Sequence, residues 1–175
     1  MTARRHQPEF EALLREHQRI VYKVAAVYAH SVEDRDDLAQ EICTQLWRSF
    51  SGFDAARGKF STWMYQVALN VAISQVRRNA SRHVHAHEPL QGHHLDSIAG
   101  AQGIDEPDPR LQALHALIGE MDAFNRALIL LYLEDRSYGE IADILGISQT
   151  NVATKISRIK QSLRSQMSDA QPIGA

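Results

Sequence analysis

The last third of the chain carries a helix–glycine–helix pattern that strongly constrains the local fold. Ser137 and Glu140 fit the S-x-x-E capping box that begins a helix, and Gly146 fits the left-handed position that ends one. Ser148 can then cap a second helix. Apolar residues fall on one side of each predicted helix: Ile141, Ala142 and Leu145 in the first, Ile147 in the turn, and Val152, Ile156, Ile159 and Leu163 in the second. This pattern predicts a helix-turn-helix.

The outward positions of the second predicted helix suit DNA. A polar triplet at its start, where recognition helices meet base edges, is followed by cations, and no acid occurs between Asp143 and Asp169. The candidate DNA contacts are Gln149, Thr150, Asn151, Thr154, Lys155, Arg158 and Lys160, and Arg164 extends the cationic series. Cations also stabilise the C-terminal end of any solvated helix. That simpler explanation accounts for the cations but not for the polar triplet.

The rest of the chain also reads as helical. Between Pro8 and Phe50 there is no glycine or proline, and no alternating strand pattern appears anywhere. Pro8 suits the first turn of one helix, while Ser31 and Ser61 can cap two more. The predicted buried stripes are Phe10, Leu13, Leu14, Val21, Val24 and Tyr28; then Leu38, Ile42, Leu46 and Phe50; then Met64, Val67, Ala68 and Val71. The segment 126–134, RALILLYLE, is apolar almost all round and predicts a central buried helix.

These elements predict an all-α fold with two small helical domains joined by a flexible linker, the second containing the helix-turn-helix. We place the first domain at residues 1–80, the linker at 81–109, the second domain at 110–167 and a tail at 168–175. The linker segment is polar, acidic and rich in proline and glycine. It lacks an apolar stripe that could pack.

Composition excludes several other classes of protein. The formal net charge is −2, so a DNA-binding surface must be local, and the single cysteine, Cys43, rules out a disulfide framework. Cys43 is expected in the core. No signal peptide and no apolar run of membrane-spanning length is visible, which predicts a cytoplasmic protein without membrane insertion. His83, His85, His87, His93 and His94 lack the spacing of a structural zinc site, so a plain solvated linker is favoured over a metal site or a pH-sensitive segment.

With these features in place, the chain resembles the sigma-70 family in its compact extracytoplasmic-function (ECF) subgroup. The helix with DDLAQEICTQLW is similar to the family's region 2.2, FSTWMYQVALNVAIS is similar to regions 2.3 and 2.4, and the helix-turn-helix is similar to region 4. The resemblance implies a non-enzymatic transcription initiation factor without cofactors. Its implied partners are promoter DNA and core RNA polymerase, through the β′ clamp coiled coil and the β subunit, with an anti-sigma factor as a further candidate.

The resemblance also assigns roles to residues. The polymerase-docking set is Asp37, Leu38, Gln40, Glu41 and Thr44. The set for the single-stranded −10 element is Arg57, Lys59, Thr62, Trp63, Gln66, Asn70, Ser74 and Arg77, with Tyr65 as a second aromatic face. The helix-turn-helix contacts described above become the −35 set. Ala153 departs from the family, where many members carry Lys or Arg.

Two plainer interpretations of these residues stay open. The polar residues of the docking set, Asp37, Gln40, Glu41 and Thr44, could form an ordinary solvated helix face with i,i+4 pairs. Trp63 could be a core residue. At the level of function, the main alternative is a helix-turn-helix regulator that binds duplex DNA without polymerase. A metal-dependent hydrolase using the linker histidines is a weaker alternative, because no nucleophile–base pair, P-loop or zinc motif is present.

Overall fold

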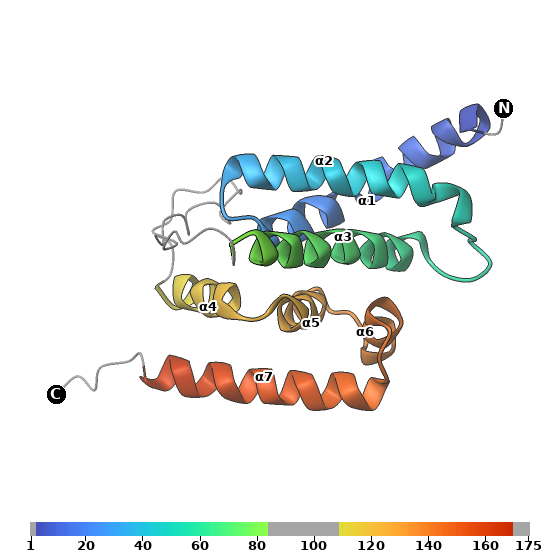
Figure 1. Cartoon of the computed structure of the whole chain (residues 1–175). Helices are drawn as coiled ribbons and strands as arrows, with labels where there is room; N and C mark the ends of the chain where they lie inside the picture. Colours follow the sequence, from blue (N-terminus) through green and yellow to red (C-terminus); the bar gives the residue numbers. More distant parts are fainter. Residues whose placement is uncertain (1–2, 84–108, 170–175) are drawn as a thin grey trace. The chain divides into compact units, whose positions relative to one another are not determined.

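The computed structural model describes residues 3–83 and 109–169, and no strand occurs among them (Figure 1). The helices are α1 (Ala3–Tyr28), α2 (Val32–Ser49), a 3-10 turn η1 (Phe50–Gly52), α3 (Phe60–His83), α4 (Pro109–Glu120), α5 (Ala123–Leu133), α6 (Tyr138–Leu145) and α7 (Gln149–Asp169). The chain divides into two compact units, Met1–Gly92 and His93–Ala175. The prediction of an all-α fold in two helical units is confirmed.

The first unit is a three-helix bundle in which each helix packs against the other two. Its core is made of side chains that are fully or almost fully buried, among them Val24, Ile42, Leu46 and Met64. Ser31 caps α2 as predicted, because its hydroxyl accepts a hydrogen bond from the Asp34 backbone N–H at 3.0 Å. Burial of one stripe per helix therefore leaves the opposite stripe of each helix to solvent.

Two predicted helix starts were wrong. Helix α1 begins at Ala3, so Pro8 lies inside it and not in its first turn. Helix α3 begins at Phe60, and the Trp63 N–H donates to the Lys59 carbonyl at 3.2 Å, so Ser61 does not cap it. Phe60 is buried among other aromatic rings, and this packing accounts for a helix start upstream of the serine.

The buried face of α3 is also rotated from its predicted position. Met64 and Ala68 are buried as expected, but Tyr65, Leu69 and Ala72 complete the face, whereas Val67 and Val71 are only half-buried. Tyr65 is 1% exposed, so its role as an aromatic face for a DNA base is excluded. The physical reason is that α3 packs against both α1 and α2, which widens its buried arc to one side.

In the second unit, α5 is the central helix that the sequence predicted. Six consecutive residues, 126–131, are buried, and α7 packs against α4, α5 and α6. One of the six is Arg126, which donates to the carbonyl oxygens of Gly119 at 2.7 Å and Met121 at 3.0 Å. The guanidinium thereby satisfies backbone acceptors at the end of α4, where the helix itself supplies no donors.

The helix-turn-helix is confirmed as α6, a turn and α7. Gly146 has φ 68°, and its N–H donates to the Ala142 carbonyl at 2.8 Å. Ser148 accepts from the Asn151 N–H at 3.2 Å at the start of α7. Val152, Ile156, Ile159 and Leu163 are buried as predicted. In α6 the buried residues are Ile141, Ala142 and Ile144, whereas Leu145, which was predicted to face inward, is only half-buried. Helix α6 packs against both α5 and α7, and Ile144 takes the buried position instead.

Gly146→Ala should lower the free energy of unfolding of the second unit by about 1–2 kcal/mol. A Cβ at this position would meet no atom within 4 Å, so the whole cost arises from the positive φ. Gly119→Ala is the matched control, because its Cβ is equally free of contacts and the residue lies inside α4. Thermal unfolding should show a loss for Gly146→Ala and none for Gly119→Ala. Equal stability of the two variants would contradict the assigned backbone strain.

The predicted linker lies almost entirely outside the described residues. Only its ends are described, and they are helical: α3 continues to His83, and α4 begins at Pro109. The tail predicted at 168–175 also starts within α7, which ends at Asp169. The side chains of the five clustered histidines lie outside what is described. In the part of the chain that is described, no helix is long and apolar enough to cross a membrane.

Candidate functional site

The outward stripe of α2 is exposed as its spacing predicts. Asp37, Gln40, Glu41 and Thr44 are all exposed. Leu38, in contrast, is 2% exposed and belongs to the core of the three-helix unit. Leu38 therefore supports α2 from beneath, and we remove it from the set of residues that can touch a partner.

The loop between η1 and α3 is anchored by aromatic packing. The ring centroid of Phe53 lies 5.3 Å from those of both Phe60 and Trp63, and 6.1 Å from that of Phe50. Asp54 shapes the turn that follows, because its carboxylate accepts the Ala56 N–H at 2.9 Å. The loop is thus fixed at its base, while its cations, Arg57 and Lys59, are exposed.

The predicted polar stripe of α3 is graded from half-buried to exposed. Thr62, Trp63 and Gln66 are half-buried, whereas Asn70, Ser74 and Arg77 are exposed. Trp63 contacts the rings of Phe50, Phe53 and Phe60 at centroid distances of 5.3–6.2 Å. Trp63 is therefore part of the aromatic cluster and is also partly accessible. Its position is compatible both with a core residue and with a residue that contacts the −10 element.

Each unit has exposed residues near its predicted DNA-binding set that the set omitted. Arg78 and Arg82 follow Arg77 on the last turns of α3, and both are exposed. In the second unit, Ser157 and Gln161 lie on the exposed face of α7 together with Thr154 and Arg158. Helical spacing from the residues already assigned could have identified all four.

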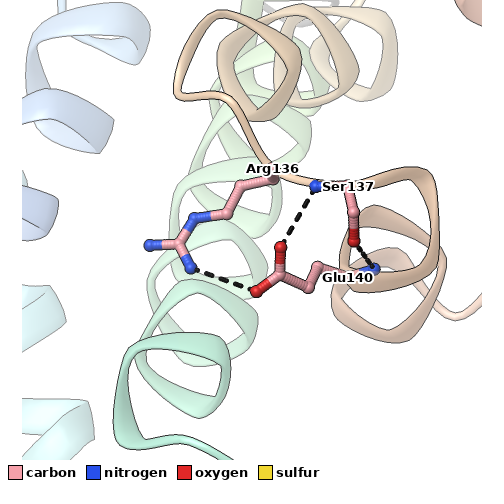
Figure 2. Close-up of polar contacts among 3 residues, drawn as sticks. All are labelled: Arg136, Ser137 and Glu140. Atoms are coloured by element: carbon pink, nitrogen blue, oxygen red, sulfur yellow. Dashed lines mark hydrogen bonds and ion pairs between the residues drawn. The ribbon is translucent and has the colours of Figure 1, made fainter.

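A capping box precedes α6, as Figure 2 shows. The Ser137 N–H donates to Glu140 Oε2 at 3.1 Å, and the Glu140 N–H donates to Ser137 Oγ at 3.2 Å. The same carboxylate meets the Arg136 guanidinium at 3.6 Å. Three neighbouring residues thereby define where α6, the first helix of the helix-turn-helix, begins.

The start of α7 presents the polar residues that the sequence singled out. Gln149, Thr150 and Asn151 are exposed, as are Thr154 and Arg158 further along. The Thr154 hydroxyl donates back to the Thr150 carbonyl at 3.0 Å, so its proton is used within the helix and its oxygen keeps only acceptor capacity. This face combines hydrogen-bonding groups with a guanidinium, the groups that contact base edges and phosphates.

The two lysines of the predicted set are placed differently from the arginines. Lys155 and Lys160 are half-buried, with each ammonium near an aromatic ring of α5. Arg158 and Arg164 are exposed. The predicted −35 set therefore divides into residues that point away from the unit and residues that also contact it.

The thiol of Cys43 lies on α2, in the first unit. It is half-buried, and this burial raises the pKa of the thiol above its ordinary value. Burial disfavours the thiolate, which is the nucleophilic form. Within the described ranges, no three histidine, cysteine or acidic residues gather as metal ligands would.

Comparison with protein families matches both units. The model for sigma-70 region 2 matches residues 13–82, and the model for sigma-70 region 4 matches residues 111–163. Together they cover most of the chain, in the order that the family has. The chain belongs to the sigma-70 family.

Its relatives assign it to the ECF subgroup of that family. The ECF RNA polymerase sigma factor SigW of Bacillus subtilis is 26% identical over 167 residues, which cover 85% of this chain and 83% of SigW. SigE of Mycolicibacterium smegmatis is 30% identical over 169 residues, which cover 90% of this chain and 61% of SigE. The resemblance stated from the sequence is thus confirmed.

Solved structures agree on the fold. The sigma factor RpoE of Bartonella quintana, solved in complex with the anti-sigma factor NepR, superposes with a TM-score of 0.70 at 18% identity and covers 94% of this chain and 99% of RpoE. CnrH, solved with the cytosolic domain of CnrY, gives a TM-score of 0.66 at 20% identity. At these identities the likeness supports the architecture alone.

Proposed function

We propose that this chain binds core RNA polymerase and directs it to promoters with matching −35 and −10 elements. The observation that carries the proposal is that one chain of this family leaves three polar surfaces exposed on its two units. These are the stripe on α2, the loop-and-stripe surface of α3, and the N-terminal half of α7. Polymerase docking, base capture and duplex recognition each require one such surface.

The α2 stripe is the proposed docking surface for the β′ clamp coiled coil. Asp37 and Glu41 are exposed and stand one turn apart, with Gln40 and Thr44 beside them. This stripe is mainly acidic, and complementary potential steers a basic partner surface onto it. Because Leu38 and Ile42 are buried beneath the stripe, α2 presents these groups from a packed, rigid element.

The loop and the outward face of α3 are the proposed −10 surface. A base displaced from the duplex is held by stacking and by hydrogen bonds to its edges. Trp63 offers a partly exposed ring, Asn70 and Gln66 offer amides, and Arg57, Lys59 and Arg77 offer charges for the phosphates. Thr62 and Ser74 complete the face. This surface suits single-stranded DNA better than duplex DNA because it combines stacking with edge contacts.

The N-terminal half of α7 is the proposed −35 reader. Gln149, Thr150, Asn151 and Thr154 lie where base edges meet a recognition helix, and Arg158 lies where phosphates flank the groove. We also propose contact with the polymerase β subunit, and restraint by an anti-sigma factor, as named for RpoE. With polymerase as the partner, the cytoplasm is the expected site of action.

In vitro transcription with purified core polymerase on a random promoter library tests the proposal. Addition of the chain should yield transcripts from a discrete set of templates that share two elements. Co-purification with core polymerase should accompany this activity. Binding to duplex DNA without polymerase association or transcription would overturn the proposal and support the helix-turn-helix regulator instead.

Asn151→Ala should relax the choice of base at one position of the −35 element. Loss of one bidentate base contact costs about 1–3 kcal/mol of discrimination, so transcription from mismatched templates should rise relative to the preferred one. Promoter selection from a library measures this effect. Ser165→Ala is the control, because Ser165 is exposed on the same helix but about 21 Å further along its axis. An unchanged −35 preference in Asn151→Ala would remove this residue from the reader set.

A further inference from the structure

Two lysines border the buried stripe of α7, and each is held by a ring of α5. The stripe consists of Val152, Ile156, Ile159 and Leu163, and at 100° per residue Lys155 and Lys160 fall on its two opposite edges. Lys155 Nζ lies 5.6 Å from the centroid of the Phe124 ring. Lys160 Nζ lies 5.2 Å from the centroid of the Tyr132 ring and donates a hydrogen bond to Tyr132 Oη at 3.1 Å.

The two rings lie near opposite ends of α5, so the two lysine contacts are far apart along the helix. Phe124 is near the start of α5 and Tyr132 near its end, a separation of about 12 Å along the helix axis. An apolar stripe alone allows one helix to roll or pivot on another with little change in buried area. Two polar contacts far apart, one on each edge of the stripe, resist that motion because either movement breaks one of them.

The arginines of α7 have a different environment. Arg158 and Arg164 are exposed, and by helical spacing they lie about 130° and 110° from the centre of the buried stripe, further round the helix than either lysine. A lysine that neutralises a phosphate keeps its ammonium on the DNA side of the helix. Lys160 would have to give up its hydrogen bond to Tyr132 and turn away from α5 to do so.

We propose that Lys160 and Tyr132 form a positioning pair that sets the angle of α7 on α5, while phosphate neutralisation by this helix falls to Arg158 and Arg164. Lys155 and Phe124 form the weaker, second pair. The proposal rests on the proposed −35 function, since it concerns how α7 is presented to DNA. It makes Tyr132, which belongs to a different helix, a positioning residue for promoter binding.

The salt dependence of binding separates positioning from phosphate contact. Each phosphate neutralised releases counterions and contributes about 0.9 to the slope of log affinity against log salt concentration. A positioning residue changes affinity at every salt concentration and leaves that slope unchanged. The full chain, bound to core polymerase, is titrated with a duplex that carries the −35 element selected by the wild-type holoenzyme.

Three variants and one control make the test. Lys160→Met removes the ammonium and keeps the aliphatic stem, Tyr132→Phe removes the acceptor and keeps the ring, and the double variant closes a thermodynamic cycle. Each should weaken binding about two- to tenfold with the wild-type slope, and the double variant should be no weaker than either single one. Arg158→Met, the control, should lower the slope by about 0.9.

A slope lowered by about 0.9 in Lys160→Met, or additive losses in the double variant, would overturn the positioning role. Wild-type affinity in Lys160→Met and Tyr132→Phe, together with a lower melting temperature, would also overturn it, because the pair would then act on stability alone. If the wild-type holoenzyme itself shows no selective binding, the proposed function fails first. The two failures can be told apart, because failure of the proposed function is seen with the wild-type protein before any variant is compared.

Discussion

Alanine at both Gln66 and Asn70 should sharply reduce open-complex formation while polymerase binding stays close to normal. The two amides lie one turn apart on the outward face of α3. Each lost base contact is expected to cost about 1–3 kcal/mol. Docking should persist because its proposed surface lies on α2. Asn70 should account for the larger part of the loss in open-complex formation, since its side chain is exposed whereas Gln66 is half-buried.

Permanganate footprinting on a dependent promoter measures this effect directly. Thymines across the −10 element should lose reactivity in the double variant, and a template with a pre-melted bubble should recover only part of the loss, because base capture persists after opening. Asn79→Ala is the matched control: it is an exposed asparagine on the same helix, about half a turn away from the stripe. Wild-type thymine reactivity in the double variant would return this stripe to an ordinary solvated helix face.

The parts of the fold that the sequence predicted correctly depend on local chemistry. A capping serine, a capping box and a left-handed glycine act through atoms within three or four residues of one another. Ser31, the Ser137–Glu140 box and Gly146 all occupy their predicted roles. The four-residue stripe of α7 was predicted in full because a long amphipathic helix with one buried side has an unambiguous phase.

The errors arose where tertiary packing decides between similar local options. Tyr65 is buried and Val67 is not, because α3 packs against two partners and the width of its buried arc depends on both. The start of α3 lies at Phe60 for a related reason. Phe60 contacts the rings of His17 in α1, Phe50 in η1 and Phe53 in the loop before α3, and no local signal reports a cluster assembled from separate segments.

The candidate surfaces were predictable in outline but not in their contacts. Spacing alone placed Asp37, Gln40 and Glu41 on one exposed stripe of α2, and the family resemblance supplied their proposed role. Leu38 entered the docking set through the resemblance, although its position on the apolar stripe already indicated burial. Lys160 was assigned to the −35 set from the sequence, but the position of its ammonium could not be predicted, because a long flexible stem can place it either toward solvent or onto a neighbouring ring.

Asp37→Arg should weaken binding to core polymerase by at least about tenfold, because it places a cation where the proposed partner surface is basic. Asp37 is exposed on the outward stripe of α2, away from the buried side formed by Leu38 and Ile42. The helix content and melting temperature should therefore remain close to wild type. The loss should be largest at low ionic strength, where charges on opposing surfaces are least screened.

A quantitative pull-down of core polymerase, repeated at two salt concentrations, measures the docking effect. Glu16→Arg is the control, because it makes the same change of charge at an exposed position on α1 and tests for a non-specific effect of net charge. Gln40→Ala, which removes a polar group without altering charge, should give a smaller loss that depends less on salt. If Asp37→Arg and Glu16→Arg bind polymerase equally well, the α2 stripe is not the docking surface, and another exposed surface of the chain must make that contact.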